Sequence, residues 1–168
     1  MVAISLFITA FEMFKNRIIE KPEIFFSDGF DHDQYKSEVL SRSKSPLYSS
    51  LLWFKEMGAI DDTDIKTFDA IRKHRNEVTH ELHSFISDAK KNLDVEKFQE
   101  LIALFWEIEK WWLINFEMVI NPDMVPENID PEKVILGPIW SLQLMLDIAL
   151  GNEPKEGYYY NEFTKKHT

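Results

Sequence analysis

The 168-residue chain contains no cysteine. Disulfide scaffolds, thiolate-bound zinc and a cysteine nucleophile are therefore excluded. Glycine is also scarce, with five residues, and neither a glycine-rich phosphate-binding loop nor a Gly-x-Ser-x-Gly nucleophile turn occurs. The enzyme classes that depend on those features are therefore set aside.

The sequence also lacks an uninterrupted apolar run that fits a membrane span or a signal peptide. The apolar N-terminal stretch is broken early by Glu12, and neither a basic region nor a small-residue cleavage site accompanies it. The apolar stretch 101–120 carries Glu107, Glu109, Lys110 and Glu117, which are costly in lipid. We therefore expect a soluble, cytoplasmic protein with no membrane partner.

What the chain does contain is enough apolar material for one core. Hydrophobic residues make up 45% and aromatic residues 14% of the sequence, which suits a single ordinary domain. Helical periodicity dominates, and no convincing alternation of apolar and polar residues indicates a strand. The sequence predicts an all-α, single-domain bundle of four to six helices over residues 1–151, followed by a polar and aromatic tail, 152–168, with Tyr158–Tyr160 in it.

Proline, glycine and helix-capping residues predict where these helices begin and end. Ser45 before Pro46 is a typical start, Asp61–Thr63 and Asp94 are candidate caps, and Gly58 and Gly151 are candidate stops. Pro22 is expected to end the first helix. The expected helices run to about Glu20, over 34–40 and 46–57, from 61–63 to about 89, from 94 to before 122, and over 138–150, with loops at 21–33 and around Pro122, Pro126 and Pro131.

Two of the expected helices are apolar on almost every side. Few positions are polar in Leu104–Ile120 and in Ile139–Leu150. Such helices are buried on most sides, and in a short chain this favours burial against a second copy as well. We therefore expect a homodimer; the alternative is that these are simply the central helices of the bundle.

The helix around residues 65–89 has three faces where an amphipathic helix needs two. At 100° per residue, one stripe is apolar: Phe68, Ile71, Val78, Leu82, Phe85, Ile86 and Ala89. A second face is polar: Arg72, Asn76, Thr79, His80 and His83. The third is an ordinary solvated mixture: Lys73, His74, Glu77 and Glu81.

Arg75 falls inside the apolar stripe of this helix. A charge on a core-facing position is costly unless it is paired or used. One interpretation is structural: Arg75 pairs with an acid on a neighbouring helix, Asp147 for example, while His80 and His83 lie on the surface. The other interpretation is functional and depends on the amino-acid sequence that begins at Arg75.

Residues 75–80 read Arg-Asn-Glu-Val-Thr-His. This segment resembles the signature of the HEPN superfamily, in which arginine is followed by Asn, Asp or His and, after a short spacer, by histidine. The resemblance covers this motif and the helical layout. It implies an all-α, commonly dimeric fold and a metal-independent endoribonuclease, as found in toxins, phage-defence effectors and RNA-guided systems. Leu82 stands where HEPN toxins paired with minimal nucleotidyltransferase antitoxins have a tyrosine, so modification there is not implied.

The resemblance also implies roles for individual side chains. His80 would transfer protons, Arg75 would neutralise charge on the phosphorane, and Asn76 would orient the histidine ring or bind phosphate. The expected substrate-binding residues are Arg72, Lys73, Thr79 and His83. Neither a metal nor another cofactor is required, because the RNA 2′-hydroxyl is the nucleophile and the products carry 2′,3′-cyclic phosphate and 5′-hydroxyl ends.

The spacing of the motif has a geometric consequence. Five residues correspond to about 140° on an ideal helix, so Arg75 and His80 of one chain point in different directions. A site that uses both would therefore combine residues of two protomers. The expected partners are an RNA substrate, a second copy of the chain and an antitoxin or other regulatory protein; the alternative function is a non-catalytic HEPN-like module that binds a protein.

Two further patterns do not have the spacing of a metal site, and the net charge is unevenly distributed along the chain. The histidines at 80 and 83 are one residue short of a zincin pair, and the acidic segment 28–33 lacks the ligand order of a calcium loop. The net charge of −10 disfavours non-specific binding to nucleic acid. The densest basic spot, however, is Arg72–Arg75 on the motif helix, so we expect RNA binding to be local and selective.

Overall fold

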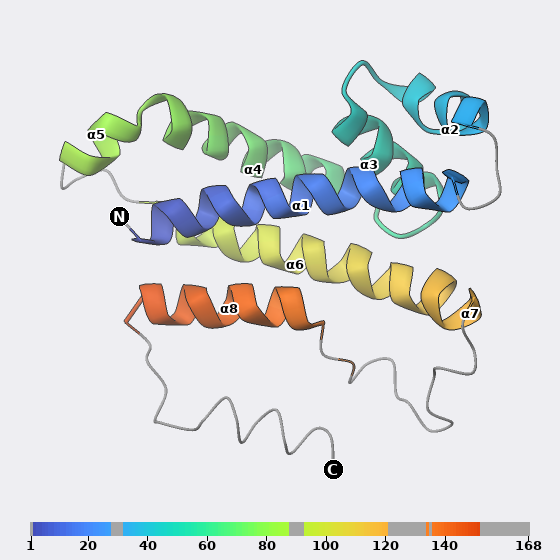
Figure 1. Ribbon diagram of the computed structural model, residues 1–168. Coiled ribbons are helices and arrows are strands. Elements are labelled where there is room, and N and C mark those ends of the chain that lie inside the picture. Colours follow the sequence, from blue (N-terminus) through green and yellow to red (C-terminus); the bar gives the residue numbers. More distant parts are fainter. Residues whose placement is uncertain (1, 28–31, 88–92, 121–133, 135, 152–168) are drawn as a thin grey trace, which may run out of the picture.

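The computed structural model describes residues 2–27, 32–87, 93–120, 134 and 136–151 (Figure 1). These residues form helices and connecting turns with no strand among them, which confirms the prediction of an all-α, single-domain fold. The long helices are α1 (Val2–Ser27), α3 (Pro46–Glu56), α4 (Asp62–His80), α6 (Val95–Trp112) and α8 (Gly137–Ala149). The shorter elements are α2 (His32–Glu38), the 3₁₀ turn η1 (Leu40–Arg42), α5 (Leu82–Ser87), the π-helix η2 (Leu113–Glu117) and α7 (Met118–Ile120).

Three sequence features lie outside the described residues. They are the acidic loop at 28–31, the proline-rich connection at 121–133 and the tail at 152–168. Within the described part of the chain, no helix is both long and apolar enough to cross a membrane.

Helix α1 is the element around which the bundle is built. It runs alongside α4 and α6 (Figure 1) and contacts α2, α3 and α8 as well. Its fully buried Phe14 packs against Phe68 of α4, with ring centroids 5.9 Å apart, and against Phe105 of α6, at 5.5 Å. Two turns nearer the N-terminus, Phe7 lies 5.6 Å from Phe98 of α6. The aromatic stripe of α1 therefore joins α4 to α6.

The predicted end of the first helix at Glu20 is wrong, because α1 continues through Pro22 to Ser27. An internal proline costs about 3 kcal/mol. Beyond it, Phe26 is buried, and Phe25 packs against Phe116 at 4.9 Å and Trp53 at 6.1 Å. Burial of each large side chain contributes about 1.5–3 kcal/mol, so this aromatic cluster offsets the cost of the proline.

The prediction of one unbroken helix from 61–63 to about 89 is also wrong. Helix α4 ends at His80, since Glu81 has φ −108° and ψ 21°, outside the helical region. Because of the turn, side chains after Glu81 no longer follow the helical periodicity of α4. Leu82 is therefore exposed rather than part of the buried apolar stripe. The motif histidine is therefore the last residue of α4.

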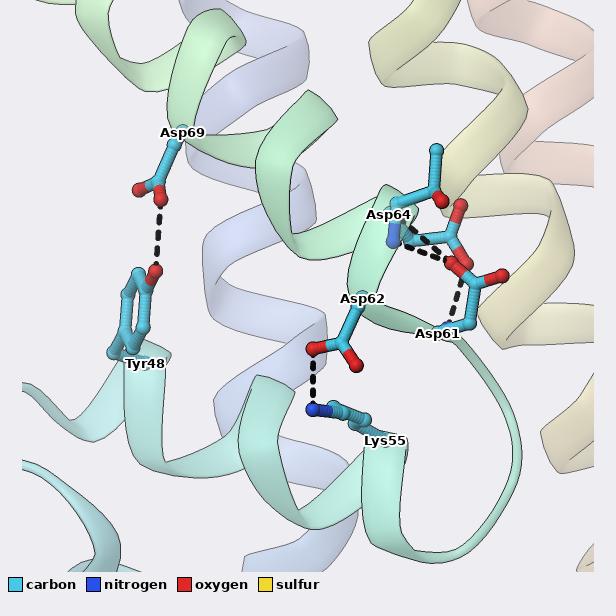
Figure 2. A network of polar contacts seen from close by, with 7 residues as sticks. Tyr48, Lys55, Asp61, Asp62, Asp64 and Asp69 are labelled. Carbon is cyan, nitrogen blue, oxygen red and sulfur yellow. Dashed lines mark hydrogen bonds and ion pairs between the residues drawn. The ribbon is translucent and has the colours of Figure 1, made fainter.

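The predicted helix ends are confirmed at several other positions. Asp61 caps α4 in a reciprocal arrangement with Asp64, in which each side chain accepts a hydrogen bond from the other residue's backbone N–H (Figure 2). Ser45 caps α3 and Asp94 caps α6. Gly58 and Gly151 follow α3 and α8 with φ near +80°, a conformation that glycine adopts at little cost.

The C-terminal end of α6 departs from the expected regular helix. Residues 113–117 form the π-helix η2, whose hydrogen bonds span five residues instead of the four of an α-helix. Buried Lys21 of α1 reaches both Glu109 (3.2 Å) and Glu117 (3.8 Å). Eight residues of regular helix would rotate these two carboxylates about 80° apart, and the wider turn brings them toward the same side. Burial lowers the pKa of Lys21, against the attraction of Glu109.

The packing of α1 predicts the effect of truncating its central aromatic residue. Phe14→Ala is expected to lower the free energy of unfolding by about 3–5 kcal/mol, because it leaves a cavity between α1, α4 and α6. Urea denaturation measures the change. The matched control is Ile24→Ala on the same helix, where the side chain is half exposed and a change below about 1 kcal/mol is expected. Equal losses in the two variants would contradict the role of α1.

Candidate functional site

An open groove of about 570 Å³ lies along the solvent-facing side of α4. Four of the predicted site residues line it together: Arg72, Lys73, Asn76 and His80. The other lining residues are the acids Asp69, Glu77 and Glu81. Every one of these residues belongs to α4 or immediately follows it, so this helix alone supplies the lining.

The spacing of the sequence explains why these side chains share one face. Positions 69, 72, 76 and 80 recur at three- and four-residue intervals, which places them on one side of a helix. Phe68, Ile71 and Val78 are fully buried, and α4 packs with its apolar side on α6 and α1. Burial of one face therefore leaves the motif face to solvent.

Arg75 lies at the edge of the groove rather than in its lining. Its Nη2 donates a hydrogen bond to Oε1 of Glu12 on α1, at 2.5 Å, and its guanidinium carbon lies 5.3 Å from the centre of the Phe11 ring. Its Nη1 donates to Oδ1 of Asn76 at 3.3 Å. The arginine thus has the acidic partner that the structural interpretation expected, but this is Glu12 and not Asp147, and Asn76 links it to the groove.

The ion pair at Glu12 is shared by two cations. Lys15 Nζ lies 2.5 Å from Oε2 of the same carboxylate. The pKa of Glu12 is lowered chiefly by the hydrogen bond from Lys15 and then by that from Arg75, against partial burial, which raises it. Glu12 is therefore ionised at neutral pH. Nε of Arg75 is buried and makes no hydrogen bond within the described residues.

Arg72 is held in the groove by Asp69 of its own helix and by Tyr48 of α3. Its Nη2 lies 3.3 Å from Asp69 Oδ1, and its guanidinium carbon lies 5.7 Å from the Tyr48 ring centre. The Tyr48 hydroxyl donates to Asp69 Oδ2 at 2.9 Å (Figure 2). Burial, followed by the bond to Asp69, raises the pKa of Tyr48, so the hydroxyl remains a donor. Half of the Arg72 side chain is exposed, which leaves it accessible to an anion.

Two predicted substrate-binding residues lie apart from the groove lining. The Thr79 hydroxyl donates to the backbone carbonyl of Arg75 at 2.8 Å, so it is directed along its own helix. His83 lies in α5, past the turn at Glu81, and is exposed. The described groove therefore contains neither side chain.

His74 was expected on the solvated face, and this expectation is wrong. Its side chain is 13% exposed, and its ring lies 5.4 Å from that of Phe7. Nε2 accepts a hydrogen bond from the backbone N–H of Asp94 at 3.2 Å, so His74 ties the start of α6 to α4. On the helical wheel, position 74 lies only about 40–60° from Ile71 and Val78, and this proximity to the apolar stripe was the signal for burial.

The basic run at 72–75 is divided around the helix. Arg72 and Lys73 line the groove, His74 points toward the core, and Arg75 faces Glu12. Successive residues are separated by about 100°, so the four consecutive side chains cannot form one patch. The groove therefore presents two cations and a histidine among three acids, and its positive charge is more local than the sequence indicated.

The site offers no evident place for a metal ion. Across the described parts of the chain, no three His, Asp or Glu side chains come together as a cation-binding group. Comparisons by family model, sequence and structure found no protein family, curated protein or solved structure that matches the chain. The function must therefore be inferred from the side chains that line the groove.

The ion pair beneath the motif predicts a pH-dependent contribution to stability. Because the folded state lowers the pKa of Glu12 below its ordinary 4.5, the carboxylate stabilises the fold above about pH 4.5, and this contribution is lost as the pH falls through the lowered value. Glu12→Gln should therefore be less stable than the wild type at pH 7, and the difference should shrink toward pH 3. Urea denaturation over this range measures it; a difference that is constant with pH would contradict the assignment.

Proposed function

We propose that the chain is a metal-independent endoribonuclease of HEPN type that acts as a homodimer, with the role of a toxin or phage-defence effector. The observation that carries the proposal is the groove on α4, where His80, Asn76, Arg72 and Lys73 share one open face. The composition supports a local role for these cations, because the rest of a chain with net charge −10 repels nucleic acid.

The groove supplies a proton-transfer group and phosphate-binding cations for RNA cleavage by the 2′-hydroxyl. His80 is exposed at the end of α4, and its imidazole can accept the proton of the attacking 2′-hydroxyl and deliver a proton to the departing 5′-oxygen. Arg72 and Lys73 bind the phosphates that flank the scissile bond. Asn76, one helical turn before His80, orients the imidazole or the phosphate.

Arg75 completes the site from the other protomer. Within one chain it lines no part of the groove with His80 and faces α1, where Glu12 holds it. In a dimer whose two α4 helices face one another, Arg75 of one chain meets the phosphate held by His80 of its partner. The guanidinium then shares its five donors between Glu12, Asn76 and the phosphorane oxygens.

The acids of the groove make this binding selective. Asp69, Glu77 and Glu81 lie among the cations, and a phosphate competes with Asp69 for Arg72. Non-specific affinity is therefore low, and a substrate binds only when its shape satisfies several contacts at once.

The first test is cleavage of total RNA in the presence of EDTA. The wild type is expected to cut RNA, leaving 2′,3′-cyclic phosphate ends, and His80→Ala is expected to lose at least about 100-fold in rate, as removal of a general acid or base does. The exposed position of His80 allows the variant to fold, which circular dichroism checks. Cleavage that EDTA abolishes, or that persists in His80→Ala, would contradict the proposal; an inactive wild type would favour the non-catalytic binding module.

The second test separates phosphate binding from general charge. Lys73→Ala should weaken binding of single-stranded RNA and reduce the salt dependence of the affinity by about one ion. Lys66→Ala is the matched control, since Lys66 is exposed on the same helix outside the groove. Fluorescence anisotropy at several salt concentrations measures both variants. The same loss in both would mean that α4 attracts RNA only through net charge.

A further inference from the structure

A second groove follows the outer face of α6, away from the residues of the motif. It consists of two depressions, of about 530 and 320 Å³, that share Ala103 and Trp106 in their linings. One end is bordered by Ile139 and Trp140 of α8, and the other by Gly58 and Ala59 after α3. Ala103, where the two depressions meet, is exposed and small, so its side chain occupies little of the space between them.

The dimensions of this groove suit a helix. Its lining along α6 and η2 extends from Gln99 to Asn115, which at about 1.5 Å per residue is roughly 24 Å, or some 16 residues of a facing helix. The partly exposed side chains of Trp106, Trp111 and Ile114 give it an apolar lining. A groove of this kind accepts the apolar face of an amphipathic helix.

The groove is acidic at Glu107. Partial burial raises the pKa of this carboxyl, and the neighbouring carboxylates of Asp64 and Asp61 raise it further. Both aspartates cap α4 (Figure 2), and their oxygens accept backbone hydrogen bonds there. Lys110 borders the groove nearly one turn further along, so the unbalanced negative charge lies on the Glu107 side.

We propose that this groove binds an amphipathic helix of a partner protein, with apolar side chains against Trp106 and Trp111 and a lysine or arginine beside Glu107. A second copy of the chain fits less well. Helix α8 exposes Met145 and Ile148, but its sequence contains no basic residue to face Glu107. The inference is independent of the ribonuclease activity, because it involves none of the residues that line the groove on α4.

The test uses a synthetic 16-residue helical peptide with leucines at i, i+3, i+4 and i+7 spacing and lysines on its flank. Emission from the tryptophans of the groove should shift to shorter wavelength on binding, because the peptide excludes water from them. Ala103→Trp, which fills the groove, should weaken binding at least about tenfold, as loss of a central contact does. Ser141→Trp, on the exposed side of α8 and outside the groove, is the control for an added tryptophan.

The charge is tested with two variants of equal net charge. Glu107→Gln should weaken binding about two- to fivefold, the effect of a partly exposed ion pair. Glu100→Gln, which removes a carboxylate paired with Lys97 outside the groove, should leave the affinity unchanged. Equal affinity of the wild type for the lysine peptide and a glutamate version of it, or equal binding by Ala103→Trp and wild type, would overturn the proposal.

Discussion

The structure depends on the burial of the aromatic face of α1 between α4 and α6. Phe14 contacts both helices at once, and Phe7 extends the contact toward the start of α6. This packing fixes which side of α4 is turned inward. The opposite side, with Asn76 and His80, is left to solvent as a consequence. The packing of the core therefore determines where the groove on α4 lies, although none of the groove residues belongs to the core.

The same packing explains the unusual place of Arg75. The helical wheel puts this residue in the apolar stripe, and a neutral side chain there would only add to the core. Glu12 on α1 gives the guanidinium a partner at the edge of the interface, and Phe11 covers one face of it. The ion pair permits a charge at this position; it does not by itself create a function. The hydrogen bond to Asn76 gives the arginine its connection to the groove.

Helix ends were predicted correctly where they are determined by residues close to them in sequence. The caps at Ser45, Asp61 and Asp94 and the stops at Gly58 and Gly151 act within a few residues, and each is present. The end of the first helix was missed because Pro22 is outweighed by contacts of Phe25 with Trp53 and Phe116, which are distant in sequence. The π-helix after Trp112 was missed for a similar reason, since its register brings Glu109 and Glu117 toward Lys21 of another helix.

The candidate site, too, could be predicted only as far as local helical spacing determines it. Helical spacing places Arg72, Asn76 and His80 on one face without knowledge of the rest of the chain, and the structure has them together. Spacing could not show that Glu12 is the partner of Arg75, because that contact crosses 63 positions of sequence. It could not show where α4 ends either, so His83 was placed with His80 although a turn separates the two.

The central claim is that Arg75 of one protomer acts with His80 of the other. It is tested most directly by mixing two inactive variants, Arg75→Ala and His80→Ala, after brief denaturation and joint refolding, and measuring RNA cleavage in EDTA. Random pairing makes half of the dimers mixed, and each mixed dimer regains one intact site, so the mixture should recover about a quarter of wild-type activity. A mixture as inactive as either variant alone would contradict a site shared between two chains.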